Sequence, residues 1–211
     1  MPDVLAGVPA RHGHFLLESG YHTDRWLDLD ALFVDTARMA PLVAALASRL
    51  RVHRVSAICG PLLGGAFLAQ AVASVLGVGF YYTEPEPADS QTGLFVAGYR
   101  LPSELQRRIR GERLAVTDDV ISAGSSVRAT IAAIQQAGAT TVAVGALVAL
   151  GDAAVDYLTQ QAIPLETLDR QHLTLWKPDS CPLCRNEQPL VDPRKPLTVA
   201  TTAEPDRPAT T

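Results

Sequence analysis

Short apolar segments alternate with helical patterns along most of the chain, and this alternation limits the folds open to it. Strands are expected at the apolar segments, residues 54–59, 78–83, 113–117 and 140–150. Helices are expected at the Ala-rich or amphipathic segments, residues 35–50, 64–77 and 126–138. Alternating strands and helices predict a parallel sheet covered by helices, a doubly wound α/β fold.

Length and composition favour one domain, which we place at residues 1–190. The chain has 211 residues, 47% of them hydrophobic, which is enough for a sizeable core. Residues 191–211 have the composition of a disordered tail. The net charge of −4 gives no general attraction to nucleic acid or to an anionic membrane.

The sequence also predicts a cytoplasmic protein that is not bound to a membrane. No apolar run reaches the roughly 18 residues that a membrane span needs. The N-terminal residues lack the positive start and apolar stretch of a signal peptide. Three cysteines without such a signal indicate a reducing compartment.

The segment RLAVTDDVISAGSSV, residues 113–127, ends an apolar run on two adjacent aspartates. In an open parallel sheet, ligands bind beyond the carboxyl ends of the strands, where Asp118 and Asp119 are expected. Carboxylates accept hydrogen bonds from the vicinal hydroxyls of a ribose. The small residues up to Ser126 allow backbone N–H groups to surround a phosphate at a helix start. This order favours a ribose 5-phosphate site over an ordinary turn in which Ser126 is only an N-cap.

A second loop, CGPLLGGA at residues 59–66, also joins an expected strand to an expected helix. Its glycines Gly60, Gly64 and Gly65 allow the backbone to approach a ligand closely. Such turns are common, so the loop is weak evidence alone. On the same sheet edge as the two aspartates, it predicts a place for a second phosphate group.

These segments resemble those of the type I phosphoribosyltransferases, with the orotate phosphoribosyltransferase branch the most similar. Three stretches carry the resemblance: GHFLLESGYHTDRWLDLD (13–30), CGPLLGGAFLAQAVASVLG (59–77) and AVTDDVISAGSSV (115–127). The resemblance implies a five-stranded parallel core with a small hood, formed here by about residues 1–34 and 160–190. It also implies a homodimer.

The resemblance implies that 5-phosphoribosyl 1-pyrophosphate (PRPP) gives its ribose 5-phosphate to orotate or another nitrogen heterocycle and releases pyrophosphate, as in pyrimidine biosynthesis. Asp118 and Asp119 would be the catalytic residues that hold the ribose hydroxyls. The 5-phosphate would lie on Val120, Ile121, Ser122, Ala123, Gly124, Ser125 and Ser126. Pyrophosphate, with Mg²⁺ bound through PRPP, would face Pro61, Leu62, Leu63 and Gly64. Arg25 and Phe15 are candidates for the base pocket, although core packing is the commoner role of a phenylalanine.

The chain departs from the orotate branch where that branch has basic residues. The segment that matches its flexible catalytic loop, residues 84–97, has three acidic residues and no basic one. Tyr21 replaces a lysine, and Leu150 falls where an arginine would hold the orotate carboxylate. Losing one charged contact to a developing anion costs about 100- to 1000-fold in rate. The alternative function is therefore a weak or inactive PRPP- or nucleotide-binding regulatory protein.

Other basic side chains are candidates to replace the missing ones. Arg100 is a candidate to contact pyrophosphate. His12, His14 and His22 flank the hood segment and can donate to a base, although surface positions are the default expectation for them.

Cys181 and Cys184 have the C-x-x-C spacing of a zinc site. Zinc in a structural site takes four ligands, and the chain has no second cysteine pair because Cys59 is expected inside the fold. A zinc site would then need two copies of the chain meeting across a dimer axis. The alternative is a pair of free thiols in the hood.

Overall fold

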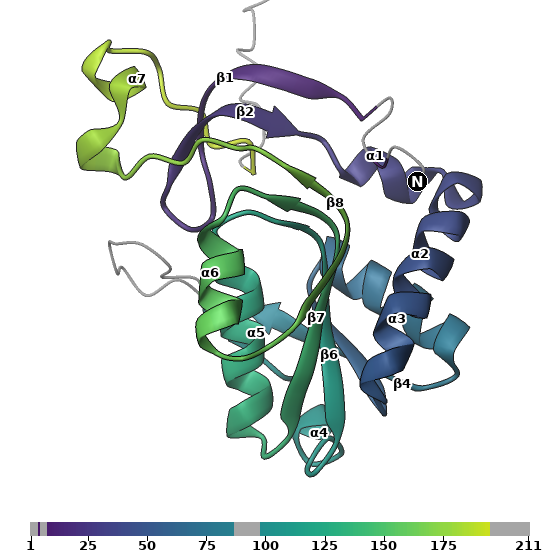
Figure 1. Cartoon of the computed structure of the whole chain (residues 1–211). Helices are drawn as coiled ribbons and strands as arrows, with labels where there is room; N and C mark the ends of the chain where they lie inside the picture. Colours follow the sequence, from purple (N-terminus) through teal and green to yellow (C-terminus); the bar gives the residue numbers. More distant parts are fainter. Residues whose placement is uncertain (1–3, 5–7, 87–97, 195–211) are drawn as a thin grey trace, which may run out of the picture.

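The computed structural model describes residue 4 and residues 8–86 and 98–194. Its core is a six-stranded sheet in the order β5-β4-β3-β6-β7-β8 (Figure 1). Five strands are parallel: β3 (Ala57–Pro61), β4 (Gly79–Pro85), β6 (Arg113–Ile121), β7 (Thr140–Leu150) and β8 (Leu165–Gln171). The short edge strand β5 (Tyr99–Arg100) is antiparallel to β4. The predicted doubly wound parallel sheet is confirmed.

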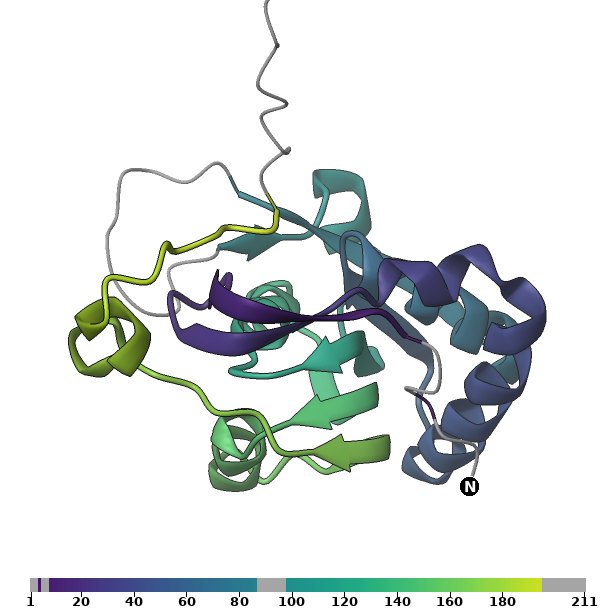
Figure 2. The ribbon, with the colours of Figure 1, turned by 90° about the horizontal axis from the view of Figure 1, so that it is seen from above.

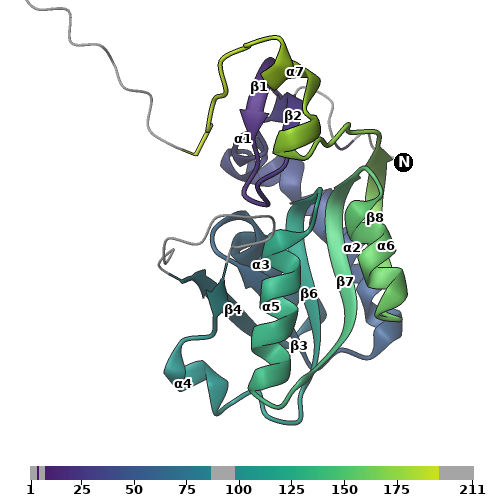
Figure 3. The same ribbon diagram turned by 90° about the vertical axis from the view of Figure 1, so that its left-hand side faces the viewer.

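Helices cover both faces of the sheet (Figures 1 and 3). One face packs against α2 (Thr36–Leu50) and α3 (Gly64–Leu76), and the other against α5 (Ser125–Gln136) and α6 (Ala153–Gln160). Strand residues alternate between the two faces: Ala115 packs with the first pair of helices, and Val116 with the second. Because both faces are covered, the central strand β7 is apolar along nearly its whole length, whereas the outer strand β8 carries polar residues.

A second sheet, of two antiparallel strands, lies over the carboxyl ends of the core strands (Figures 1 and 2). It comprises β1 (Ala10–Leu16) and β2 (His22–Leu27) and leads through α1 (Asp30–Val34) into α2. Residues 172–194 run beside it and include α7 (Pro182–Arg185). We call β1, β2 and residues 172–194 the hood.

Backbone hydrogen bonds join the two parts of the hood. His22 and Trp176 exchange two of them, with N···O distances of 2.8 and 2.9 Å. The N–H of Leu16 donates to Val191 O at 2.9 Å, and the N–H of Val191 donates to His14 O at 2.8 Å. The hairpin and the end of the described chain therefore form one unit.

Several boundaries differ from the sequence-based expectations; β3, for example, spans Ala57–Pro61 and not residues 54–59. Strand β6 continues to Ile121 because it pairs with β7 along its whole length, so the aspartates lie within the strand and not beyond it. Residues 165–171, which we expected in the hood, form β8 of the core sheet. Helix α5 begins at Ser125.

The remaining elements are short: α4 (Ser103–Gln106) and the 3₁₀ turns at Arg51–His53 and Pro178–Ser180. The acidic loop and the expected tail fall largely on residues 87–97 and 195–211, which lie outside the described residues. Within the described part of the chain, no helix has the length and apolar character to span a membrane.

Candidate functional site

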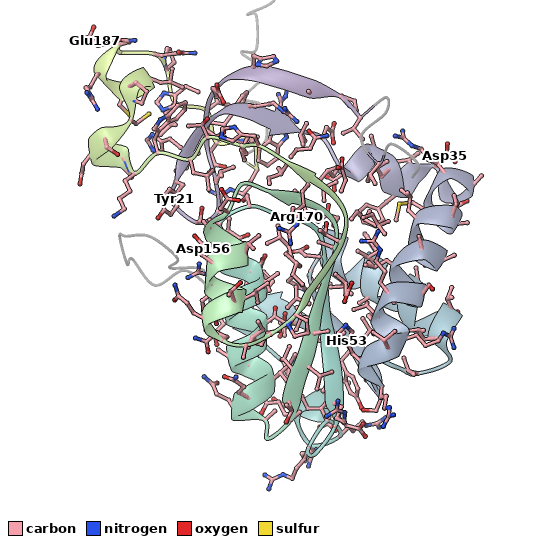
Figure 4. All side chains as sticks on the ribbon, viewed as in Figure 1. Tyr21, Asp35, His53, Asp156, Arg170 and Glu187 are labelled. Carbon is pink, nitrogen blue, oxygen red and sulfur yellow. The ribbon has the colours of Figure 1, made fainter. Side chains whose placement is uncertain are left out.

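A cavity of 670 Å³ lies between the hood and the carboxyl ends of the core strands. Most of its lining comes from the β1–β2 hairpin and the residues that follow it, the loop after β3, the end of β6 with the start of α5, and the last described residues. Tyr99, Leu150 and Leu173 complete it. Figure 4 shows the side chains of the hood and of the sheet beneath it. Tyr21 lies on the hairpin and is not among the lining residues.

Asp118 and Asp119 line this cavity and lie near the C-terminal end of β6. Asp118 accepts hydrogen bonds from the Ser126 hydroxyl at 2.8 Å and from the backbone N–H of Asp119 at 3.1 Å. Burial, and secondly the neighbouring Asp119, raise the pKa of Asp118 well above its ordinary value. Burial also raises the pKa of Asp119. Burial makes both carboxyls costly to ionise. Hydrogen bonds donated by the hydroxyl groups of a ligand would stabilise their ionised forms.

The loop after β3 approaches these carboxyls so closely that it needs its glycines. A Cβ on Gly64 would lie 2.8 Å from the Asp119 carboxyl carbon, and one on Gly65 would lie 2.8 Å from Asp118 Oδ1. A Cβ on Gly60 would lie 2.0 Å from the Gly65 carbonyl oxygen. Pro61, Leu62, Leu63 and Gly64 all line the cavity, as expected for a ligand loop.

The segment from Val120 to Ser126 divides into residues that line the cavity and residues whose side chains face the core. Five of its predicted contacts line the cavity: Val120, Ser122, Gly124, Ser125 and Ser126. The side chains of Ile121 and Ala123 are buried in the core, so only their backbone groups are available to a ligand. Gly124 has φ +78°, a left-handed conformation that suits glycine and that turns the chain into α5.

Of the two base-pocket candidates, only Arg25 lines the cavity. One guanidinium N–H group donates to Gln171 Oε1 at 2.8 Å, whereas its Nε is buried with no hydrogen-bond partner among the described residues. The expectation that Phe15 lies in the base pocket was wrong. Phe15 is buried, its ring centroid lies 6.4 Å from that of Trp26, and it does not line the cavity. Trp26 and Leu150 line it instead.

Several polar residues of the cavity were not predicted. Arg11 and Arg194 add positive charge, and Glu18 accepts a hydrogen bond of 2.9 Å from the Tyr99 hydroxyl. Burial, with Glu18 as a further cause, raises the pKa of Tyr99. Arg194 binds the Asp192 carboxylate through Nε and Nη2 at 2.8 and 2.9 Å. No sequence pattern marked Arg194, because it lies in the proline-rich segment that we assigned to a tail.

Arg100, our candidate for pyrophosphate binding, is paired elsewhere. Its Nη2 lies 2.7 Å from Glu84 Oε1 across the β4–β5 ladder, and it does not line the cavity. The expectation that Arg100 compensates for the missing basic loop is therefore not supported.

The hood histidines separate into two kinds. His12 is exposed, as expected. His14 and His22 are only 2% and 4% exposed, so the surface expectation was wrong for both. Neither lines the cavity; they lie beside Cys181 and Cys184. Cys59 is fully buried in β3, as predicted.

Comparison with known proteins gives consistent matches. A family model of the phosphoribosyl transferase domain matches residues 33–182. An orotate phosphoribosyltransferase of Caldanaerobacter subterraneus subsp. tengcongensis is 30% identical over 181 residues, which cover 86% of this chain and 88% of that protein. One from Thermotoga petrophila is 31% identical over 183 residues, which cover 86% of this chain and 89% of that protein.

Solved structures match the fold. Orotate phosphoribosyltransferase from Aeropyrum pernix has a TM-score of 0.59 and 24% identity, covering 76% of this chain and 87% of that one. Adenine phosphoribosyltransferase from Thermoanaerobacter pseudethanolicus has a TM-score of 0.63 and 16% identity, covering 80% of this chain and 98% of that one. The same fold thus occurs in proteins named for two different bases.

Proposed function

Since this chain belongs to the phosphoribosyltransferase family, we propose that it transfers the ribose 5-phosphate group of PRPP to a ring nitrogen of a heterocyclic base. The observation that carries the proposal is the position of Asp118 and Asp119. They face the glycines of the loop after β3 in one cavity, beside the start of α5. Hydrogen-bond acceptors for a ribose thus lie between two anion-binding backbone segments.

In the proposed reaction, the base nitrogen forms a bond to C1 of the ribose while the bond from C1 to the pyrophosphate oxygen breaks. The bonding electrons leave with pyrophosphate. Positive charge develops on the ribose ring, and the carboxylates of Asp118 and Asp119 stabilise it electrostatically while they hold the hydroxyls. Backbone N–H groups from Ser122 to Ser126 and the N-terminus of the 12-residue α5 hold the 5-phosphate.

Mg²⁺ is the cofactor that we propose to accompany PRPP. Mg²⁺ is usually held by substrate phosphates, water and one or two carboxylates, so PRPP would carry the ion into a cavity that Asp118 and Asp119 line. When bound, the ion would neutralise charge on the pyrophosphate. The glycine-rich loop would contribute by letting the pyrophosphate approach the backbone of residues 61–64.

Orotate is the acceptor that we propose to test first. The relatives named above at 30–31% identity are orotate phosphoribosyltransferases. Leu150 offers no charge, but Arg25 lines the same cavity and has a buried Nε without a partner among the described residues. A guanidinium in this position suits a planar carboxylate, which accepts two parallel hydrogen bonds.

One observation favours a second candidate, a PRPP-binding regulatory protein that does not turn over. Glu84, at the start of the acidic loop, engages Arg100, so the basic residue nearest that loop is held in an ion pair outside the cavity. A binding protein needs the aspartates and the phosphate loops but no cation on the loop at residues 84–97.

Calorimetric titration of PRPP with Mg²⁺ into the protein tests the shared first step. We expect micromolar binding by the wild type and by Asp156→Asn, an exposed control on α6. Asp119→Asn should weaken binding by at least tenfold, because an amide accepts less strongly from ribose hydroxyls than a carboxylate does. Binding that is absent at millimolar PRPP, or unchanged in Asp119→Asn, would contradict the site.

Pyrophosphate release then separates the two candidates. Orotate, adenine and other heterocycles are supplied in turn with PRPP and Mg²⁺. Turnover with one base identifies the acceptor. Tight PRPP binding without release from any base would favour the regulatory protein.

A further inference from the structure

Four side chains of the hood converge outside the ligand cavity. His14 on β1, His22 on β2, and Cys181 and Cys184 around α7 bring one ligand atom each to within 4.8 Å of the others. Three of the four residues are buried, and Cys184 is exposed. Their sequence separation reaches 170 residues, between His14 and Cys184, so only the folded hood assembles them.

Three of the distances between these atoms match the edges of a tetrahedral metal site, and all lie within 4.8 Å. With Zn–N near 2.0–2.1 Å and Zn–S near 2.3 Å, the edges of such a tetrahedron are about 3.3–3.8 Å. His14 Nε2 lies 3.4 Å from Cys181 Sγ and 3.7 Å from Cys184 Sγ, and His22 Nδ1 lies 3.3 Å from Cys184 Sγ. The two ring nitrogens are 3.0 Å apart.

A hydrogen bond on the far side of one ring orients it for this role. His14 Nδ1 lies 2.8 Å from the Gln188 carbonyl oxygen, which can only accept, so Nδ1 carries the hydrogen. The neutral ring then presents the lone pair of Nε2 to the cluster. Metal-bound histidines are commonly fixed by such a bond from their other nitrogen.

We propose that His14, His22, Cys181 and Cys184 bind one structural Zn²⁺ within a single chain. Two thiolates and two imidazoles are a donor set that zinc takes in closed, four-coordinate sites. With four protein ligands, no position stays open for a substrate, and none of these side chains lines the cavity. The two histidines supply the ligands that the C-x-x-C pair lacks, so a second copy of the chain is not needed.

The site explains how a poorly packed segment keeps its place. Among residues 174–194, Cys181 is the single buried residue. A segment with so little apolar burial gains little from the hydrophobic effect, and a metal can replace that stabilisation. Zinc would fasten this segment to the hairpin, and with it Pro193 and Arg194 at the edge of the cavity.

Metal analysis of untagged, full-length protein, purified in reducing buffer without chelator, tests the proposal. We expect about one zinc per chain in the wild type. Cys184→Ser and His22→Gln should each lower the content to below a tenth. His12→Gln, an exposed histidine of the same hairpin, should leave it unchanged.

Replacement of zinc by Co²⁺ provides a readout that does not depend on the variants folding. Two thiolates and two imidazoles around Co²⁺ should give the intense visible absorption of a tetrahedral site, with thiolate charge-transfer bands. Trypsin should cleave after the exposed Arg185 faster once a chelator has removed the metal. A wild-type protein with less than a tenth of a zinc per chain and no such Co²⁺ spectrum would overturn the proposal. So would a Cys181–Cys184 disulfide in that protein, or another metal at stoichiometric amount.

Discussion

Replacing Gly64 with alanine should displace the Asp119 carboxylate without unfolding the protein. The new Cβ would lie 2.8 Å from Asp119 Cγ and Oδ2 and 3.0 Å from Oδ1. Ordinary contacts begin near 3.4 Å, so the carboxyl must move by about 0.6 Å. It can do so because the clash is with the end of a side chain. At Gly60 the added Cβ would lie 2.0 Å from the backbone oxygen of Gly65, so Gly60→Ala should prevent correct folding.

The size of the binding effect follows from this displacement. A misplacement of about 1 Å at a reacting group costs on the order of 100-fold. For the smaller shift at Asp119 we expect PRPP affinity to fall about 10- to 30-fold, or roughly 1.4–2 kcal/mol. Alanine loses less conformational entropy than glycine when the chain folds into a helix, which alone would raise the free energy of unfolding of Gly64→Ala by roughly 0.5–1 kcal/mol. The clash with Asp119 offsets that gain.

A double-mutant cycle isolates the contact. Unfolding in urea is measured for the wild type, Gly64→Ala, Asp119→Ala and the double variant, and PRPP binding is measured by calorimetry for Gly64→Ala. Without the Asp119 carboxyl the clash disappears, so Gly64→Ala should be more favourable in that background by about 1 kcal/mol. Equal stability effects in both backgrounds, together with unchanged PRPP affinity, would refute the reasoning.

Three further predictions concern single side chains. Arg25→Gln removes the guanidinium that we assign to the acceptor base, so KM for orotate should rise about 10- to 150-fold. PRPP affinity measured by calorimetry should stay within twofold. Equal losses of affinity for orotate and for PRPP would contradict the assignment. Arg100→Ala breaks a pair with Glu84 whose side chains are 50% and 33% exposed, so the free energy of unfolding should change by less than about 1 kcal/mol and PRPP affinity should not change. Burial raises the pKa of the Cys59 thiol to about 12, so a thiol reagent at pH 8 should label Cys59 only in urea, and rapid labelling of the native protein would show that β3 opens.

The core of the fold was predictable because its signals are local. The run at residues 140–150 is apolar at nearly every position, and the structure buries it on both faces as β7. Both ligand loops were also predictable from local signals, namely the glycines after β3 and the small residues before α5. The end of β6 was not predictable, since it depends on pairing with β7, which lies more than 20 residues further along the chain.

The hood was harder to predict because its pattern is irregular. Along β1, His12 is exposed, whereas His14 and Phe15 are consecutive buried residues. The register with β2 shifts between His12 and Phe15, so the alternation of inward and outward side chains fails there. Sequence alternation would give His12 and His14 the same environment. The cluster of two histidines and two cysteines could therefore not be predicted until the hairpin and residues 181–184 were placed together.

The two aspartates that we assign to the ribose belong to the sheet, and the basic residues of the cavity belong to the hood. The hood therefore supplies positive charge that the segment at residues 84–97 lacks. Asp118 and Asp119 belong to β6, whereas the basic residues that line the cavity, Arg11, Arg25 and Arg194, all belong to the hood. For a ligand that carries phosphates, Arg11 and Arg194 offset the repulsion by the two carboxylates, whereas Arg25 is assigned to the acceptor base. If the hood lifts, the site loses its three cations at once while the sheet stays folded. Stability of the hood and affinity for an anionic ligand are therefore linked, and a change that loosens only residues 172–194 should weaken PRPP binding before it lowers the stability of the core.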